Sequence, residues 1–125
     1  MPTEDCLFCQ PTDEEIVIFN DLCYGRWDSY PVTAGHMLLV PFRHVPDYFH
    51  ADAEEKFALW ELLERAREVI RERFKPGGFN VGINIGSAAG QSIFHLHVHV
   101  IPRYVGDVHD PKGGVRGVIP GKQKY

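Results

Sequence analysis

The stretch FHLHVHVIPR, residues 94–103, alternates three histidines with apolar side chains before it reaches a proline. Successive side chains of a β-strand point to opposite faces of a sheet, so this alternation predicts a strand. The apolar set should face the core, and the histidines should form a row on the other face. The apolar set is Phe94, Leu96, Val98 and Val100. The histidine row is His95, His97 and His99. The fold must therefore give this strand a core on one side and leave room for a site on the other.

A long helix is predicted over residues 53–74, because apolar side chains recur there at steps of three and four residues. Asp52 is a suitable N-cap, and Glu55 follows three positions later, as in a capping box. The segment Lys75-Pro-Gly-Gly78 ends the pattern.

Strand-like patterns predict four further strands, over residues 15–19, 22–28, 37–40 and 79–85. The last of these is joined to the histidine strand by a short glycine-bearing loop, so the two should pair antiparallel. The expected fold class is α+β, with an antiparallel β-sheet of about five strands and one long helix packed on it. We expect a single domain over residues 1–125, in which residues 105–125 form an extended C-terminal tail.

Charge, apolar runs and cysteine content argue against a nucleic-acid-binding, membrane-spanning or disulfide-rich secreted protein. The formal net charge is −4, whereas a nucleic-acid surface needs basic side chains. No apolar run approaches the roughly 20 residues of a membrane span, and the start MPTEDC lacks the features of a signal peptide. Three cysteines, an odd number, argue against a disulfide framework. We therefore expect a cytoplasmic protein with neither nucleic acid nor membrane as partner.

The histidine row has three interpretations: a partly exposed strand face, a catalytic zinc site, or a wall that binds phosphate with one imidazole as nucleophile. Successive residues on a flat strand seldom reach one ion together, so a zinc site would need a ligand from elsewhere. Residues 84–92, NIGSAAGQS, supply amides, hydroxyls and accessible backbone N–H groups just before the row. These groups suit phosphate and ribose better than zinc, so the sequence favours the phosphate interpretation.

The segment GQSIFHLHVHVIPR closely resembles the motif of the histidine triad family, His-φ-His-φ-His-φ-φ with φ apolar. Supporting matches are Asp28, Tyr30-Pro31, Gly35-His36, Leu39-Val-Pro41 with His44, Asn84 and Gly90-Gln91-Ser92. The resemblance implies that the protein binds nucleotides and hydrolyses or transfers nucleoside monophosphate groups. The ending HVIPR looks more like the dinucleoside polyphosphate hydrolases, including the fragile-histidine-triad type, than the adenosine phosphoramidases. A phosphoramidase-type activity, and a nucleotide-binding module with little turnover, are the alternatives.

The resemblance also implies roles for individual residues. His97 would attack the α-phosphorus and form a nucleotidyl-histidine, with His99 stabilising phosphate oxygens and His95 supporting the site. The other nucleotide contacts would be Asp28 to the ribose, Asn84 to the ribose-phosphate, and Gln91 and Ser92 to phosphate or leaving-group oxygens. Without the resemblance, Asp28 would be a turn residue and Asn84 a hairpin residue. His36 has no assigned role, because its ring can equally be structural.

The pair Cys6 and Cys9 is half of a zinc site, which needs two more nitrogen or sulfur ligands. A redox pair or two unliganded thiols are the alternatives. In several bacterial histidine triad proteins such a pair binds zinc with two histidines, whose counterparts here are His44 and His95. The resemblance thus implies a structural zinc and a homodimer, with magnesium needed only by a polyphosphate substrate.

Overall fold

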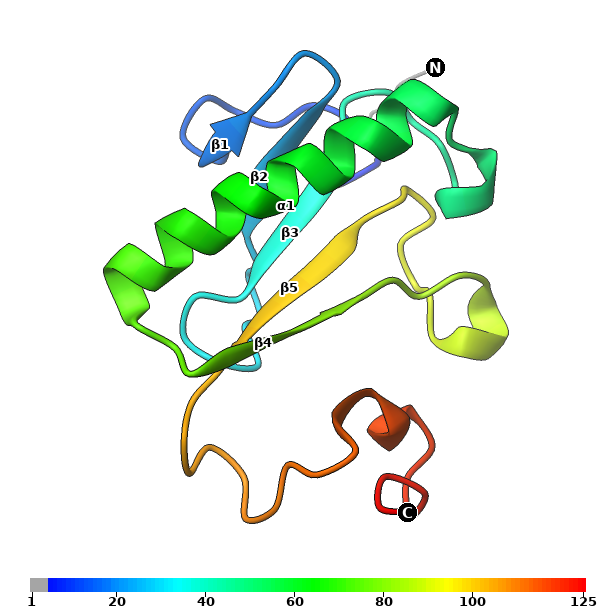
Figure 1. Cartoon of the computed structure of the whole chain (residues 1–125). Helices are drawn as coiled ribbons and strands as arrows, with labels where there is room; N and C mark the ends of the chain where they lie inside the picture. Colours follow the sequence, from blue (N-terminus) through cyan, green and yellow to red (C-terminus); the bar gives the residue numbers. More distant parts are fainter. Residues whose placement is uncertain (1–4) are drawn as a thin grey trace.

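The computed structural model describes residues 5–125 (Figure 1). Its strands are β1 (Ile18–Phe19), β2 (Cys23–Trp27), β3 (Met37–Pro41), β4 (Gly78–Gly82) and β5 (Val98–Arg103). Its helix is α1 (Ala53–Phe74), and its short 3-10 turns are η1 (Tyr48–His50), η2 (Ser87–Ala89) and η3 (Gly114–Val118). Across residues 5–125, no helix combines the length and apolar character that crossing a membrane requires.

The five strands form one antiparallel sheet in the order β1-β2-β3-β5-β4, and α1 lies across one face of it (Figure 1). This confirms the expected α+β fold with five antiparallel strands and one long helix. The core between α1 and the sheet includes Cys23, Met37, Leu39, Leu59, Leu62, Ile70, Val98 and Val100. A second, smaller cluster lies on the other face and contains Phe8, Tyr24, Leu38 and Val40. The N-terminal segment thus covers part of the face that α1 leaves free.

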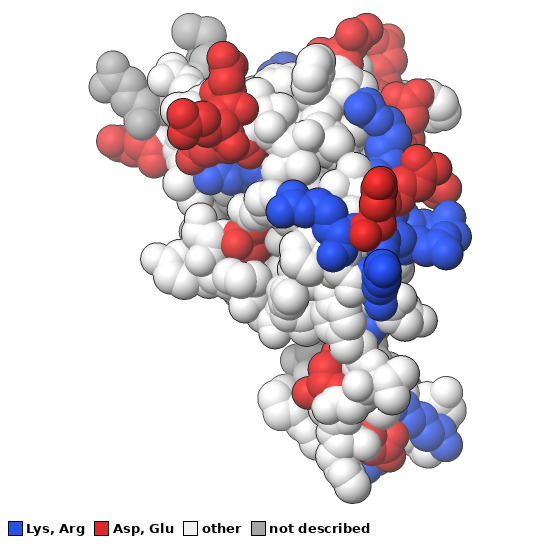
Figure 2. Space-filling view, turned by 90° about the vertical axis from the view of Figure 1, so that its left-hand side faces the viewer, with Lys and Arg blue, Asp and Glu red and all other residues white. Residues whose placement is uncertain are grey.

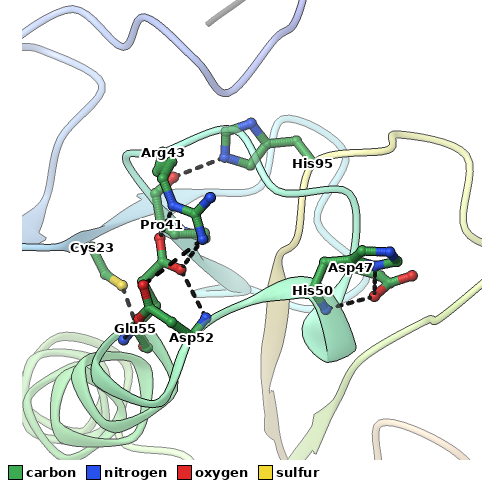
Figure 3. Close-up of polar contacts among 8 residues, drawn as sticks. All are labelled: Cys23, Pro41, Arg43, Asp47, His50, Asp52, Glu55 and His95. Atoms are coloured by element: carbon green, nitrogen blue, oxygen red, sulfur yellow. Dashed lines mark hydrogen bonds and ion pairs between the residues drawn. The ribbon is translucent and has the colours of Figure 1, made fainter. Parts of the chain in front are cut away.

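The ends of α1 follow from local chemistry. Asp52 accepts a hydrogen bond from the backbone N–H of Glu55, and the Glu55 carboxylate accepts one from the N–H of Asp52, which confirms the capping box. Glu55 is 3% exposed and also binds the Arg43 guanidinium at 2.6 and 3.0 Å (Figure 3). The helix ends at Lys75, whose φ of 54° is left-handed. Basic side chains gather on the side of the molecule that includes this end (Figure 2), where they complement the helix dipole.

Four strands are shorter than the sequence suggests, and of these β2 lacks only one residue at each end. β1 keeps two of the five predicted residues, β4 ends at Gly82 instead of 85, and β5 begins at Val98 instead of 94. Residues 94–97 leave the sheet because the N–H of Leu96 donates to the carbonyl of Val45 at 2.8 Å instead of to a neighbouring strand. The expectation that Phe94 faces the core is wrong, since this side chain is 50% exposed.

Residues 105–125 leave β5 and run beside β4 in a series of turns that includes η3 (Figure 1). At Gly113 the φ is 89°, and an added Cβ would lie 1.8 Å from the carbonyl oxygen of Gln123. This position therefore requires glycine, which folds the segment back on itself. That the whole chain is a single domain stays a prediction.

Candidate functional site

A pocket of about 410 Å³ opens on the face of the sheet opposite α1. Its volume lies in the range of small-ligand sites. Five of the six residues predicted to bind nucleotide line it, namely Asp28, Asn84, Ser92, His97 and His99. They come from the end of β2, the loops on either side of η2, and β5, so the fold brings distant parts of the chain together here.

His97 is held in one tautomer. Its Nδ1 lies 2.8 Å from the carbonyl oxygen of His95. Because a carbonyl only accepts hydrogen bonds, Nδ1 must carry the proton and donate it, which leaves the lone pair on Nε2. The ring contacts those of Phe8 and His99, with centroid distances of 5.1 and 5.2 Å. An imidazole fixed in this way presents a nucleophilic nitrogen.

His99 is oriented by a chain of hydrogen bonds through His36. The backbone N–H of Val32 donates to His36 Nδ1 at 3.2 Å, so the His36 proton is on Nε2. His36 Nε2 then donates to His99 Nδ1 at 2.9 Å and lies 3.4 Å from a carboxylate oxygen of Asp28. The proton of His99 is therefore on Nε2, as a donor. Sequence reasoning assigned no role to His36. The available signal was its place just before β3, whose Leu38 pairs with His99.

Burial keeps these two imidazoles neutral. It lowers the pKa of His99 to about 4, and the neighbouring His97 and His36 rings add to the effect. Burial also lowers the pKa of His36, against the opposing charge of Asp28. At neutral pH, His99 is therefore an uncharged hydrogen-bond donor.

Protein stability should fall as the pH drops from about 6.5 toward 4. The unfolded His99 titrates near pH 6.5, so the unfolded chain binds this proton before the folded protein does. The stability linked to the neutral ring is complete above about pH 6.5 and is lost as the pH falls through about 4. We expect a loss of roughly 1–3 kcal/mol, measured by urea unfolding across this range. His99→Asn should show a shallower dependence, and an unchanged slope would contradict the assignment.

The side chain of Gln91 makes hydrogen bonds to backbone groups around its own loop. Its side chain is 5% exposed, accepts a hydrogen bond from the N–H of Gly86 at 2.9 Å and donates to the carbonyls of Pro46 and Ile93. It does not line the pocket, whereas its neighbour Ser92 does. Gln91 therefore shapes the loop, and a direct contact with nucleotide stays a prediction.

Asp28 is a turn residue that also lines the pocket. One of its carboxylate oxygens accepts from the backbone N–H of Tyr30 at 2.8 Å, which makes it a turn residue. The carboxylate also lines the pocket, where its oxygens can accept hydrogen bonds from hydroxyl groups.

The four residues predicted to bind metal converge from three separate segments. Cys6 Sγ, Cys9 Sγ, His44 Nδ1 and His95 Nδ1 all lie within 4.8 Å of one another. The contacts are 3.0 Å for Cys9–His44, 3.2 Å for His44–His95, 3.3 Å for Cys6–His95 and 3.4 Å for Cys9–His95. Two thiolates and two imidazoles form a common structural zinc set.

The tautomer of His95 fits this set. Its Nε2 donates to the carbonyl of Pro41 at 2.8 Å (Figure 3), so the lone pair is on Nδ1. Nδ1 lies 3.3 and 3.4 Å from the Sγ atoms of Cys6 and Cys9. Asp28, His36 and His99 also lie within 4.8 Å of one another, but the proton on His36 Nε2 occupies the position that a metal would need. That group is therefore a hydrogen-bond chain.

The third cysteine has no part in either group. Cys23 is fully buried against α1, where its Sγ donates to the carbonyl of Glu55 at 3.8 Å (Figure 3). Burial raises the pKa of this thiol to about 12, so it behaves as a small apolar side chain.

The cluster of Cys6, Cys9, His44 and His95 and the pocket share one segment of the chain. Leu7 and Phe8, which lie between the two cysteines, both line the pocket. Phe8 is 1% exposed, and its ring stands between those of His95 and His97, at 5.9 and 5.1 Å. Whatever holds Cys6 and Cys9 therefore also places one wall of the pocket.

Comparison with known proteins agrees with this geometry. The HIT domain model matches residues 10–106. The AP-4-A phosphorylase of Mycobacterium tuberculosis is 40% identical over 103 residues, which are 80% of this chain and 53% of that protein. The bis(5'-adenosyl)-triphosphatase of Dictyostelium discoideum is 36% identical over 89 residues, 71% of this chain and 60% of that protein.

A solved structure with a similar fold is described as a Zn-bound histidine triad family protein from Mycobacterium smegmatis. It has a TM-score of 0.75 and 31% identity, and the match covers 85% of this chain and 80% of that one. The present chain spans about half the length of the AP-4-A phosphorylase that it matches. Since the family match includes the sheet, α1 and all three histidines of the row, the chain belongs to the HIT domain family of histidine triad proteins.

Proposed function

We propose that the protein is a nucleotide hydrolase or nucleotidyl transferase that cleaves at the α-phosphate of a diadenosine polyphosphate or similar nucleotide, through a covalent intermediate on His97. The observation that carries this proposal is the hydrogen bond from His97 Nδ1 to the carbonyl of His95, because it leaves Nε2 unprotonated. The names of two relatives, an AP-4-A phosphorylase and a bis(5'-adenosyl)-triphosphatase, support the substrate class.

In the first step, the Nε2 lone pair of His97 forms a bond to the α-phosphorus, and the bond to the bridging oxygen breaks. The leaving group takes that electron pair, and the Nε2–H of His99 donates to a phosphoryl oxygen. The imidazole of the adduct is positively charged, so its Nδ1–H bond to the His95 carbonyl becomes stronger. In the second step, water attacks phosphorus, the P–N electron pair returns to Nε2, and a nucleoside monophosphate and a proton leave.

A substrate panel tests this function. We expect turnover of at least one among diadenosine polyphosphates, ADP and adenosine phosphoramidate, with magnesium present as counter-ion of the polyphosphates. Activity should survive treatment with a chelator under two conditions. Elemental analysis must show that the structural metal remains bound, and magnesium must be added back for the polyphosphates. Tight AMP binding without turnover would instead indicate a nucleotide-binding module. Activity restored only by zinc, in a protein that stays folded without it, would indicate a zinc hydrolase that uses the histidine row.

We also propose that Cys6, Cys9, His44 and His95 hold a structural zinc, which ties the N-terminal segment to the sheet. The donor set and the His95 tautomer support this, as does the zinc named for the Mycobacterium smegmatis protein. Zinc would serve here as a cross-link, and the reacting phosphate would be handled by His97 and His99.

A homodimer completes the proposal. Within the described residues the outer edge of β4 makes no backbone hydrogen bond, although η3 contacts this strand. The backbone groups that η3 leaves uncovered could pair with a second copy. We expect light scattering at micromolar concentration to give about twice the chain mass of 14.2 kDa. A value equal to the chain mass would remove this part of the proposal.

A further inference from the structure

One charged residue in the pocket has no role in the chemistry proposed above. Arg26 on β2 pairs with Leu38 on β3, and Leu38 pairs with His99 on β5. Directly paired residues project from the same face of a sheet, so these three side chains form a row across three strands. Adjacent strands are about 4.8 Å apart, which puts Arg26 roughly 10 Å from His99 along the row. This separation suits the length of a nucleotide.

The guanidinium of Arg26 is buried but retains unused donors. The residue is 5% exposed and lines the pocket. Its Nη2 binds a carboxylate oxygen of Glu15 at 3.1 Å, and its Nη1 donates to the carbonyl of Leu7 at 3.4 Å. A guanidinium has five N–H donors, so these two contacts and the nearby Tyr24 hydroxyl, within residues 5–125, leave two. Glu15 is not among the residues that line the pocket. Of the Arg26–Glu15 pair, the donor Arg26 lines the pocket and the acceptor Glu15 does not.

The two ends of the pocket differ in chemistry. Arg26 lies beside three apolar lining residues: it donates to the carbonyl of Leu7, its guanidinium lies over the Phe8 ring, and it pairs with Leu38. The other end holds the imidazoles and the small polar side chains. The Phe8 ring joins the ends, because it lies 5.1 Å from the His97 ring and 5.4 Å from the Arg26 guanidinium carbon. A nucleotide with its α-phosphate at His97 therefore places its base in the apolar end, within reach of Arg26.

We propose that Arg26 makes the pocket prefer guanine over adenine, because guanine presents a carbonyl oxygen, O6, beside N7. This inference rests on the proposed function and names the base of its substrate. Guanine offers O6 and N7, both acceptors, to the donor-only guanidinium, which is the commonest specific contact between arginine and a base. Adenine replaces O6 with an amino group, which sets a donor against a donor. Among the diadenosine polyphosphates and similar nucleotides of the proposed function, those that contain guanine would then be preferred over those that contain only adenine.

The test compares IMP with AMP, which share ribose and phosphate and differ in the 6-oxo or 6-amino group and in the proton on N1, together with GMP. Isothermal titration of the metal-containing wild-type protein should show that GMP and IMP bind about tenfold or more tightly than AMP. In Arg26→Leu this ratio should approach one, because GMP and IMP binding weakens while AMP binding is kept. Glu15→Gln is the matched control: it keeps the guanidinium and alters only its outer partner, so the ratio should persist.

Wild-type protein that binds AMP as tightly as IMP, or more tightly, would overturn the proposal without any variant. Equal weakening of all three nucleotides in Arg26→Leu would also overturn it, since Arg26 would then serve only to anchor the N-terminal segment. If that variant does not fold, the wild-type IMP to AMP ratio decides alone. Absence of binding by every nucleotide would be a failure of the proposed function itself, and this result is distinct from a reversed preference.

Discussion

His97→Asn is expected to keep nucleotide binding and to lower turnover by several powers of ten. Asparagine has a similar shape and hydrogen-bonding capacity, but it cannot form a stable nucleotidyl adduct, so the covalent route is lost. Binding should persist because Asp28, Asn84, Ser92 and His99 still line the pocket. Single-turnover kinetics and titration with a nucleoside monophosphate measure the two effects separately.

His109→Asn is the matched control for this variant, because His109 lies in the C-terminal segment and does not line the pocket. It should keep full activity. Two successive displacements each invert the configuration at phosphorus, so a chiral phosphorothioate should react with overall retention. Overall inversion, or nearly normal turnover in His97→Asn, would mean that water attacks directly and that the histidines only hold phosphate.

Replacing both Cys6 and Cys9 by serine is expected to remove zinc and to lower the melting temperature by about 10 °C or more. Serine is a poor zinc ligand, and two imidazoles alone do not complete a structural site. The loss would also release Phe8 from its place beside Tyr24, Leu38 and Val40. Elemental analysis of protein purified without chelators should find one zinc per wild-type chain and none in the variant.

Cys23→Ala separates ligand loss from general destabilisation. Its thiol is fully buried, so removing it creates a cavity and lowers stability while the proposed zinc ligands stay intact. This control should keep its zinc. Full zinc occupancy in the Cys6→Ser/Cys9→Ser protein would place the metal elsewhere, on the histidine row.

The parts of the fold that the sequence predicts are those decided by neighbouring residues. The long helix and its capping box depend on residues within one turn of each other, and both are found where expected. The start of β5 depends instead on a distant partner, because the N–H of Leu96 bonds to Val45. Alternation alone therefore extended the strand to Phe94, which lies outside it.

In the site, too, features set by neighbouring residues could be predicted and those set by distant contacts could not. The histidine row and Asn84 could be selected from their pattern and from the family motif. The role of His36 could not, because it depends on a contact with His99, 63 residues away in the chain. The resemblance predicts that Gln91 contacts phosphate or leaving-group oxygens, and this stays a prediction; its side chain makes hydrogen bonds to backbone groups of its own loop and of Pro46. Local sequence does not record which polar groups a loop satisfies internally.

The short spacing of the cysteine pair has a thermodynamic consequence. Leu7 and Phe8 form a wall of the pocket, while the residues on either side of them are proposed metal ligands. With metal on both thiols, this wall is held in place before the nucleotide arrives, so ordering it costs no binding free energy. The two equilibria then form a closed cycle, in which metal and nucleotide change each other's affinity by the same factor. Nucleotide should accordingly raise the affinity for zinc, measured at equilibrium by competition with a chelator, by the same factor by which zinc tightens the binding of nucleotide.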